Sequence, residues 1–227
     1  MQKGVQLYAI RGLCAENLKK GLQTAAKIGY AGVEFAGFFN HPAKEVYTWL
    51  QEYRLQVIGA HVSADEIFDH PDETIAYHRD IGNKRIICPW FDMKTRKDVD
   101  NLADKVKAVE ALYKNNGMKL YYHNHTHEFM IEDGECLFDY LAAATGLNLE
   151  IDVDLICRGG QDPLKYLKEY HDRVEIVHIR HGHADIDVIM NYLKMTPVQW
   201  IIAEPESTQE KQGQIDSISK DYVYLNQ

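Results

Sequence analysis

Short apolar stretches with the composition of β-strands alternate with segments of helical periodicity along the whole chain. The stretches that predict strands are 4–10, 32–35, 57–62, 84–90, 118–125, 147–154, 173–180 and 198–204. The segments that predict helices are 15–28, 42–53, 71–81, 97–115, 134–144, a short one opened by Pro163, 186–193 and 215–224. The clearest helix is 97–115, where apolar residues recur every three or four positions before the Asn116-Gly117 stop.

Strands that alternate with helices predict parallel strands joined by right-handed crossovers. Eight such units favour a single α/β domain over residues 1–227, a (β/α)8 TIM barrel with eight parallel strands. An open doubly wound sheet is the alternative. It is disfavoured because the turn after the first predicted strand, IRGLCAEN, has one glycine and no GxGxxG pattern.

Composition narrows the classes of function. The chain is 45% hydrophobic and 26% charged, and 25 basic against 34 acidic residues give a net charge of −9. This charge argues against binding to a nucleic-acid backbone, and no apolar run is long enough to span a membrane. The N-terminus lacks an apolar signal core, and four cysteines without a CxxC pair indicate reduced thiols. We therefore expect a cytoplasmic protein that binds a small molecule.

Ionisable and aromatic side chains gather where the predicted strands end, which is where TIM barrels carry their reactive groups. Eleven histidines are present, and seven of them lie between positions 123 and 183. The residues at or near the strand ends are Arg11, Glu34, His61, Trp90, His123, Asn124, His125, Asp152, Asp154, His178, Arg180, Glu204 and Glu206. Such a set predicts an active site at this end of the barrel.

Three of these residues end the last three predicted strands at equal intervals. Asp152, His178 and Glu204 follow one another in steps of 26 residues, so neighbouring strand ends would bring them around one ion. On the fifth strand side chains alternate between the two faces, which makes His123 the expected fourth ligand. Two carboxylates with imidazoles suit one divalent ion such as Mn²⁺, Co²⁺, Fe²⁺ or Zn²⁺ better than Ca²⁺.

Several motifs occur in an order that resembles a known family. They are GVQLYAIR, GYAGVEF, YHNHTHEF with a following D-G turn, EIDVD, a GG-DP step, VHIR, GxxDID and AEPE. Together they resemble the sugar phosphate isomerase/epimerase group of the xylose-isomerase-like TIM barrels, most strongly from Met118 to Glu206. Members bind one divalent metal through Glu, Asp, His and Glu on strands five to eight. The resemblance therefore implies Asp152, His178 and Glu204 as ligands, with His123 at the position of the first Glu.

Such a site supports proton abstraction next to a carbonyl, because a metal that holds two vicinal oxygens stabilises an enediolate. We expect a metal-dependent isomerase or epimerase of a sugar, sugar phosphate or keto-sugar. The expected catalytic residues are Glu128, as the base, and Glu204, as ligand or base. The expected substrate-binding residues are Glu34, His61, Trp90, His125 and Arg180. The partner is then a small sugar or sugar derivative, not a nucleic acid or a membrane, and the chain is compatible with a homo-oligomer.

Three other functions are compatible with parts of this pattern. A metal-dependent dehydratase or lyase acting on a keto-sugar or inositol-like compound shares the first chemical step. A DNA-cutting phosphodiesterase of the same superfamily uses three zinc ions and a basic groove, which the charge of −9 disfavours. A non-catalytic sugar-binding barrel with a decayed site is suggested by His123 and Arg180, which replace the family's acidic residues on strands five and seven.

The positions of His123 and Glu128 generate the first prediction. His123→Ala should strongly weaken metal binding, because the imidazole closes the fifth strand. Glu128→Gln should keep the metal and lose turnover, as expected for a base. If Glu128 supplies the ligand instead, the two variants should exchange their effects. Metal content of both variants, measured side by side at neutral pH, decides between these outcomes.

Overall fold

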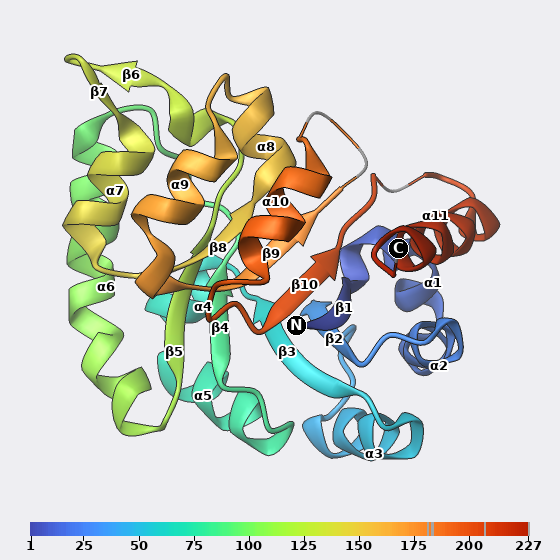
Figure 1. The fold of residues 1–227 in the computed structure, drawn as a ribbon. Coiled ribbons are helices and arrows are strands. Elements are labelled where there is room, and N and C mark those ends of the chain that lie inside the picture. Colours follow the sequence, from blue (N-terminus) through green and yellow to red (C-terminus); the bar gives the residue numbers. More distant parts are fainter. Residues whose placement is uncertain (181, 183, 207, 227) are drawn as a thin grey trace.

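The computed structural model describes the chain except residues 181, 183, 207 and 227. Eight parallel strands form a closed barrel in the order β1-β10-β9-β8-β5-β4-β3-β2 (Figure 1). They are β1 (Gln2–Gln6), β2 (Gly32–Ala36), β3 (Gln56–His61), β4 (Arg85–Cys88), β5 (Lys119–His123), β8 (Asn148–Asp152), β9 (Val174–Ile179) and β10 (Trp200–Ala203). The predicted TIM barrel is confirmed.

Helices surround the strands in Figure 1. They are α1 (Arg11–Glu16), α2 (Leu18–Ile28), α3 (Ala43–Tyr53), α4 (Ala64–Phe68), α5 (Pro71–Asp80), α6 (Arg96–Asn115), α7 (Leu137–Thr145), α8 (Val153–Arg158), α9 (Pro163–Glu169), α10 (Ile186–Leu193) and α11 (Lys211–Tyr224). Short 3-10 helices cover Leu7–Ile10, His127–Phe129 and His171–Arg173. A hairpin of β6 (Ile131–Glu132) and β7 (Glu135–Cys136) projects beside α7.

Most of the apolar core lies between the strands and this layer of helices. Strand residues such as Val33 and Phe35 are fully buried and share one cluster with helix residues such as Leu22 and Val46. A second, smaller cluster of Ile58, Ile176, Trp200 and Ile202 lies nearer the amino ends of the strands. The carboxyl-terminal halves of the strands are therefore left to carry polar groups inside the barrel.

Several predicted strands are too long, and in two cases a side chain ends the strand by capping the next helix. The predicted strand 4–10 ends at Gln6, whose side-chain oxygen accepts from the amide of Tyr8 at 3.0 Å. The predicted strand 147–154 ends at Asp152, whose carboxylate accepts from the amide of Leu155 at 2.9 Å and opens α8. Local side-chain capping therefore overrides apolar composition at both ends.

The segment 134–144, predicted as a turn and helix, begins with the end of a hairpin, and its helix starts at Leu137. Its turn uses Asp133 and Gly134, both with positive φ, at 49° and 83°. Two such residues are typical of a two-residue hairpin turn.

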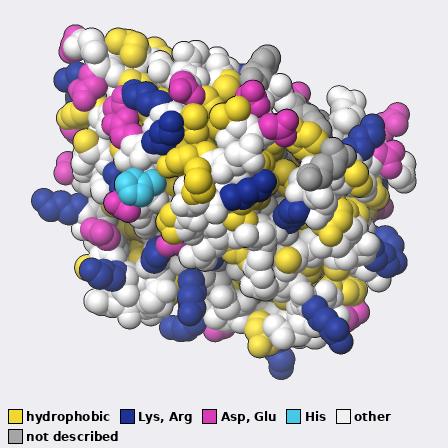
Figure 2. All heavy atoms as spheres, in the orientation of Figure 1, with side chains coloured by type: hydrophobic (Ala, Val, Ile, Leu, Met, Phe, Trp, Pro, Cys, Tyr) yellow, Lys and Arg dark blue, Asp and Glu magenta, His cyan; other side chains and the backbone are white. Residues whose placement is uncertain are grey.

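The surface carries charges of both signs. On the face drawn in Figure 2, basic and acidic side chains are interspersed among apolar and uncharged ones. Within the described part of the chain, no helix is both long and apolar enough to cross a membrane.

The buried His78 generates a prediction on pH. Burial lowers the pKa of His78 to about 4, and its Nδ1 accepts from the side-chain amide of Asn83 at 3.0 Å. The remaining ring contacts are with Phe38 and Tyr77. The imidazole is therefore neutral in the fold, whereas in the unfolded chain its pKa is about 6.5. Stability from this group is present above that value and is lost as pH falls towards the folded pKa.

We expect this one group to lower the free energy of unfolding by about 2 kcal/mol between pH 7 and pH 5. His78→Gln keeps an acceptor for Asn83 but does not titrate, so its stability should fall less over the same interval. Urea denaturation of both proteins at each pH measures the difference. Parallel pH profiles would contradict the assignment.

Candidate metal centre

Strand alternation turns ionisable side chains into the carboxyl-terminal half of the barrel. They come from β2, β3, β5, β8 and β9 and from the residues that follow β9 and β10. The inward-facing residues are Glu34, His61, His123, Glu150, Asp152 and His178, and Arg180 and Glu204 complete the set. Nearly all of them are fully buried, so their charges must be compensated within the barrel.

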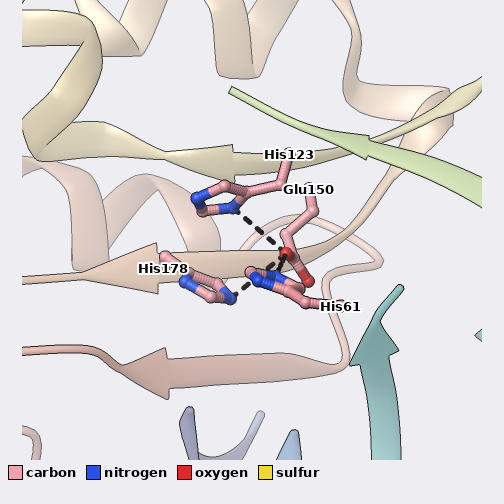
Figure 3. A group of neighbouring side chains, drawn as sticks. All are labelled: His61, His123, Glu150 and His178. Atoms are coloured by element: carbon pink, nitrogen blue, oxygen red, sulfur yellow. Dashed lines mark hydrogen bonds and ion pairs between the residues drawn. The ribbon is translucent and has the colours of Figure 1, made fainter. Parts of the chain in front are cut away.

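Glu150 lies at the centre of three imidazoles (Figure 3). Its Oε2 lies 2.8 Å from His61 Nε2, 3.1 Å from His123 Nδ1 and 3.4 Å from His178 Nε2. The three rings are packed against each other, with centroids 4.7–5.7 Å apart. One carboxylate oxygen and three ring nitrogens therefore converge on one point.

A second carboxylate, Glu34, borders this group. Its Oε2 lies 2.8 Å from His178 Nε2 and 3.2 Å from His61 Nε2, and it accepts from the side-chain amide of Gln6 at 2.8 Å. Gly59 in β3 leaves the space for Glu34, because a Cβ there would lie 3.1 Å from Glu34 Oε1. Glu34 therefore has its place fixed by two neighbouring strands.

Nearer the mouth of the barrel, Arg180 bridges two carboxylates. Its Nε donates to Asp152 Oδ2 at 2.6 Å and its Nη2 donates to Glu204 Oε2 at 2.7 Å. Glu204 Oε2 also lies 2.8 Å from His178 Nδ1, which links the two layers. The guanidinium is permanently charged and supplies a cation to both carboxylates.

Asp152 is held in position by the neighbouring strand. The side chain of Asn124 accepts from the Asp152 amide at 2.9 Å and donates to the Asp152 carbonyl at 3.2 Å. This pair continues the β5–β8 contact past the end of the strand ladder. Asn124 therefore points away from His123, as alternation along YHNH requires.

The charges of the deeper groups compensate one another. Burial opposes ionisation of Glu34, but the charges of His61 and His178 hold its pKa well below the usual range. Burial and the Glu34 charge raise the pKa of Glu150, but His178 and His123 outweigh them and lower it to about 2. Burial lowers the pKa of His61 and His178, but Glu34 and Glu150 outweigh it; the His61 pKa rises to about 10 and that of His178 rises well above its usual value. These four residues therefore balance as two carboxylates and two imidazolium ions.

The pKa values of the neighbouring ionisable residues are also shifted. Burial lowers the pKa of His123 well below its usual value and that of His125 to about 4, so both rings are neutral. Burial raises the pKa of Glu204, but His178 and Arg180 lower it to about 2 and keep it ionised. Burial raises the pKa of Asp152 despite the contact with Arg180.

The buried polar atoms of this cluster are incompletely satisfied. Glu34 Oε1, His123 Nδ1, Glu150 Oε1 and His178 Nε2 lack a hydrogen-bond partner of good geometry. Among the described residues, two four-membered sets have ligand atoms within 4.8 Å of one another: His61, His123, Glu150, His178 and His123, Asp152, His178, Glu204. The residues therefore fit a divalent ion, and His123 and His178 belong to both sets.

The remaining predicted residues lie around this centre. Trp90 is 51% exposed and packs against His125 and His127, with ring centroids 5.0 and 4.2 Å apart. Glu128 is buried, accepting from the hydroxyl of Tyr122 at 2.8 Å and the amide of His125 at 2.9 Å. Neither of the two ligand sets found among the described residues contains Glu128.

Sequence reasoning missed Glu150 and Gln6. The signal for Glu150 was present, because residues two apart on a strand share a face and Glu150 precedes Asp152 by two positions in EIDVD. Gln6 carries no such signal, since an amide near a strand end resembles any solvated side chain.

The chain has distant relatives by sequence, although no family model matches it. Among curated proteins, the inosose dehydratase of Clostridium perfringens is 26% identical over 181 residues, and that of Clostridium tetani is 24% identical over 213 residues. These matches cover 68% and 82% of this chain. The chain spans 60% of the length of the first relative and 71% of the second.

Solved structures match over the full chain. A sugar phosphate isomerase/epimerase from Parabacteroides distasonis has a TM-score of 0.88 at 19% identity and covers 100% of this chain and 98% of its own. The chain has the fold of the sugar phosphate isomerases and epimerases. A probable 3-DHS dehydratase from Bacillus anthracis has a TM-score of 0.80 at 10% identity, covering 100% and 99% of the two chains. D-allulose 3-epimerase from Methylomonas sp. has a TM-score of 0.76 at 15% identity, and the match covers 100% of this chain and 97% of its own. The resemblance read from the motifs is thereby confirmed at the level of fold.

The Arg180 bridge generates a prediction on stability. Arg180→Gln leaves two buried carboxylates without their shared cation, and we expect the free energy of unfolding to fall by about 3 kcal/mol. Asp152→Asn removes one of those charges, so the double variant Asp152→Asn/Arg180→Gln should lose less than the sum of the single losses. Urea denaturation in a chelator, which excludes any effect of bound metal, tests this. Additive losses would show that the two residues do not interact.

Proposed function

We propose that the protein is a divalent-metal-dependent isomerase or epimerase of a sugar, sugar phosphate or keto-sugar. The observation that carries the proposal is the cluster of buried imidazoles and carboxylates around His123 and His178 at the carboxyl end of the barrel. The likeness to sugar epimerase structures supports it, since one of them is a D-allulose 3-epimerase solved with D-allulose.

The ion would be held by His123 and His178 together with two further ligands. Asp152 and Glu204 complete the set expected from the sequence, and His61 and Glu150 complete the other. When bound, the ion would act as a Lewis acid and favour loss of the proton next to a carbonyl. Imidazole and carboxylate ligands suit Mn²⁺, Co²⁺, Fe²⁺ or Zn²⁺.

Side chains near the mouth would handle the substrate. Glu204 is ionised and near the mouth, and we assign it the removal of the carbon-bound proton. Arg180 lies beside it and would orient a substrate oxygen. His125 and Trp90 form an adjacent aromatic wall suited to the apolar face of a sugar ring. Glu128 holds the His125 amide, so we assign it a positioning role; action as a base would require that contact to break.

A dehydratase of a keto-sugar or inositol-like compound is the second candidate. It is favoured by the two curated relatives, both named inosose dehydratase, and by the probable 3-DHS dehydratase structure. Elimination of water begins with the same proton abstraction, so the same residues would serve it. For either enzyme we propose a cytoplasmic location and a small-molecule substrate, and either is compatible with a homo-oligomer.

Incubation with a panel of ketoses, keto-sugars and keto-inositols in D₂O tests the function. An isomerase or epimerase should place solvent deuterium on carbon in a product that has lost no water, whereas a dehydratase should release water; mass spectrometry and NMR distinguish them. Glu204→Gln should slow exchange by about 10²–10⁴-fold, as expected for loss of a general base. Trp90→Phe, which keeps an aromatic surface, is the matched control and should mainly change KM. No exchange and no elimination with any substrate, in metal-loaded protein, would count against both enzymes.

A further inference from the structure

We infer that the divalent ion of this barrel is bound in the deeper set of His61, His123, Glu150 and His178, beneath the carboxylates that the sequence predicts. The inference rests on the proposed function in supposing that the protein binds an ion. In this arrangement Asp152 and Glu204 are not ligands, and Arg180 neutralises them instead.

The deeper atoms lie at or a few tenths of an ångström inside the spacing of the ligands of a bound ion. Four ligands placed tetrahedrally at about 2.1 Å from a metal lie about 3.4 Å from one another. Glu150 Oε2 lies 2.8, 3.1 and 3.4 Å from ring nitrogens of His61, His123 and His178. Figure 3 shows the three rings directed at this oxygen from three strands. The four residues offer three imidazoles and one carboxylate, which suit Zn²⁺ or Co²⁺.

Buried atoms that lack a hydrogen bond of good geometry support the same seat. His123 Nδ1 and His178 Nε2 are two of them, although each lies at ion-pair distance from a carboxylate, and the second oxygens of Glu34 and Glu150 are two more. Each such orphan costs about 1–3 kcal/mol, so several in one place are unusual unless a ligand satisfies them. All four atoms belong to the deep cluster, and none belongs to Asp152 or Glu204.

His178 is oriented as a metal-binding histidine. Its Nδ1 lies 2.8 Å from Glu204 Oε2, and an ionised carboxylate only accepts, so Nδ1 carries the proton. Nε2, which faces Glu34 and Glu150, would then bind an ion once it had released its own proton. A carboxylate that holds the far nitrogen of a ligating histidine is a common outer partner of metals. Glu204 therefore supports a ligand in this arrangement.

The mouth carboxylates already have a cation. Arg180 bridges Asp152 and Glu204 through short hydrogen bonds, and the other oxygen of Asp152 caps the amide of Leu155. An ion bound between Asp152 and Glu204 would have to displace a guanidinium that cannot lose its charge. In the deeper set, by contrast, an ion would displace only protons, which histidines can release.

One residue of the deeper set, His61, borders a cavity. This residue is the most accessible of the four, with 10% of its side chain exposed. It lines a cavity of about 470 Å³ together with Phe38, His41, Val62 and Tyr77. The cavity therefore brings solvent to one of the four proposed ligands, His61, beside α4 and α5.

Metal titration of four variants tests the inference. Zn²⁺ and Co²⁺ affinities are measured by competition with a chelator, and the visible absorption of Co²⁺ reports its coordination, being intense for tetrahedral sites. We expect Glu150→Gln and His61→Asn to weaken binding at least 100-fold. Asp152→Asn should change it less than fivefold, and Glu204→Gln about tenfold as an outer partner. Circular dichroism and urea denaturation in chelator check that each variant is folded.

A second measurement uses the unaltered protein. Ring ¹⁵N NMR of histidine-labelled protein, with Zn²⁺ added to one equivalent, should shift the metal-binding nitrogens of His61, His123 and His178; His61→Asn assigns the first. Unchanged His61 signals, or loss of metal in Asp152→Asn with retention in Glu150→Gln, overturn the deep seat and leave the proposed function intact. Failure of the wild-type protein to bind any of the ions overturns both.

Discussion

The fold has to compensate a group of ionised side chains that are buried inside the barrel. Glu150 is fully buried, and its charge is tolerated because three imidazoles from three other strands face it. Each partner is placed by the register of a parallel strand, such as the pairing of Asp152 with His178. A barrel without this constraint would fill the same layer with branched apolar residues, as it does nearer the amino ends with Ile58, Ile176 and Ile202.

Two layers of charge follow from that constraint. The deeper layer contains Glu34 and Glu150 with histidines, and the layer near the mouth contains Asp152 and Glu204 with Arg180. His178 joins them, since its two ring nitrogens face Glu150 and Glu204 respectively. A single residue therefore couples the candidate ion site to the groups that would meet a substrate.

Replacement of an acidic residue by Arg180 is consistent with the same electrostatics. In the resemblance read from the motifs, strand seven carries an acidic residue where this chain has arginine, and strand five carries histidine in place of glutamate. Both replacements add positive charge or remove negative charge close to Asp152 and Glu204. The mouth then needs no further cation, while Glu150 concentrates negative charge one layer below. In this chain the two layers are therefore neutralised by different groups, histidines in the deeper layer and Arg180 at the mouth.

The sequence by itself determined the architecture and the end of the barrel that carries the site. Alternating strands and helices require parallel pairing, and such strands bring their carboxyl ends to one rim, so Asp152, His178 and Glu204 were expected together. Strand ends were misjudged where Gln6 and Asp152 cap the next helix, because a capping contact depends on side-chain direction. Only the tertiary structure decided the depth of each charge and its partner. Register and barrel closure bring His61 to Glu150 across 89 residues and Arg180 between two carboxylates, and these distances are set by packing in three dimensions, which linear spacing does not encode.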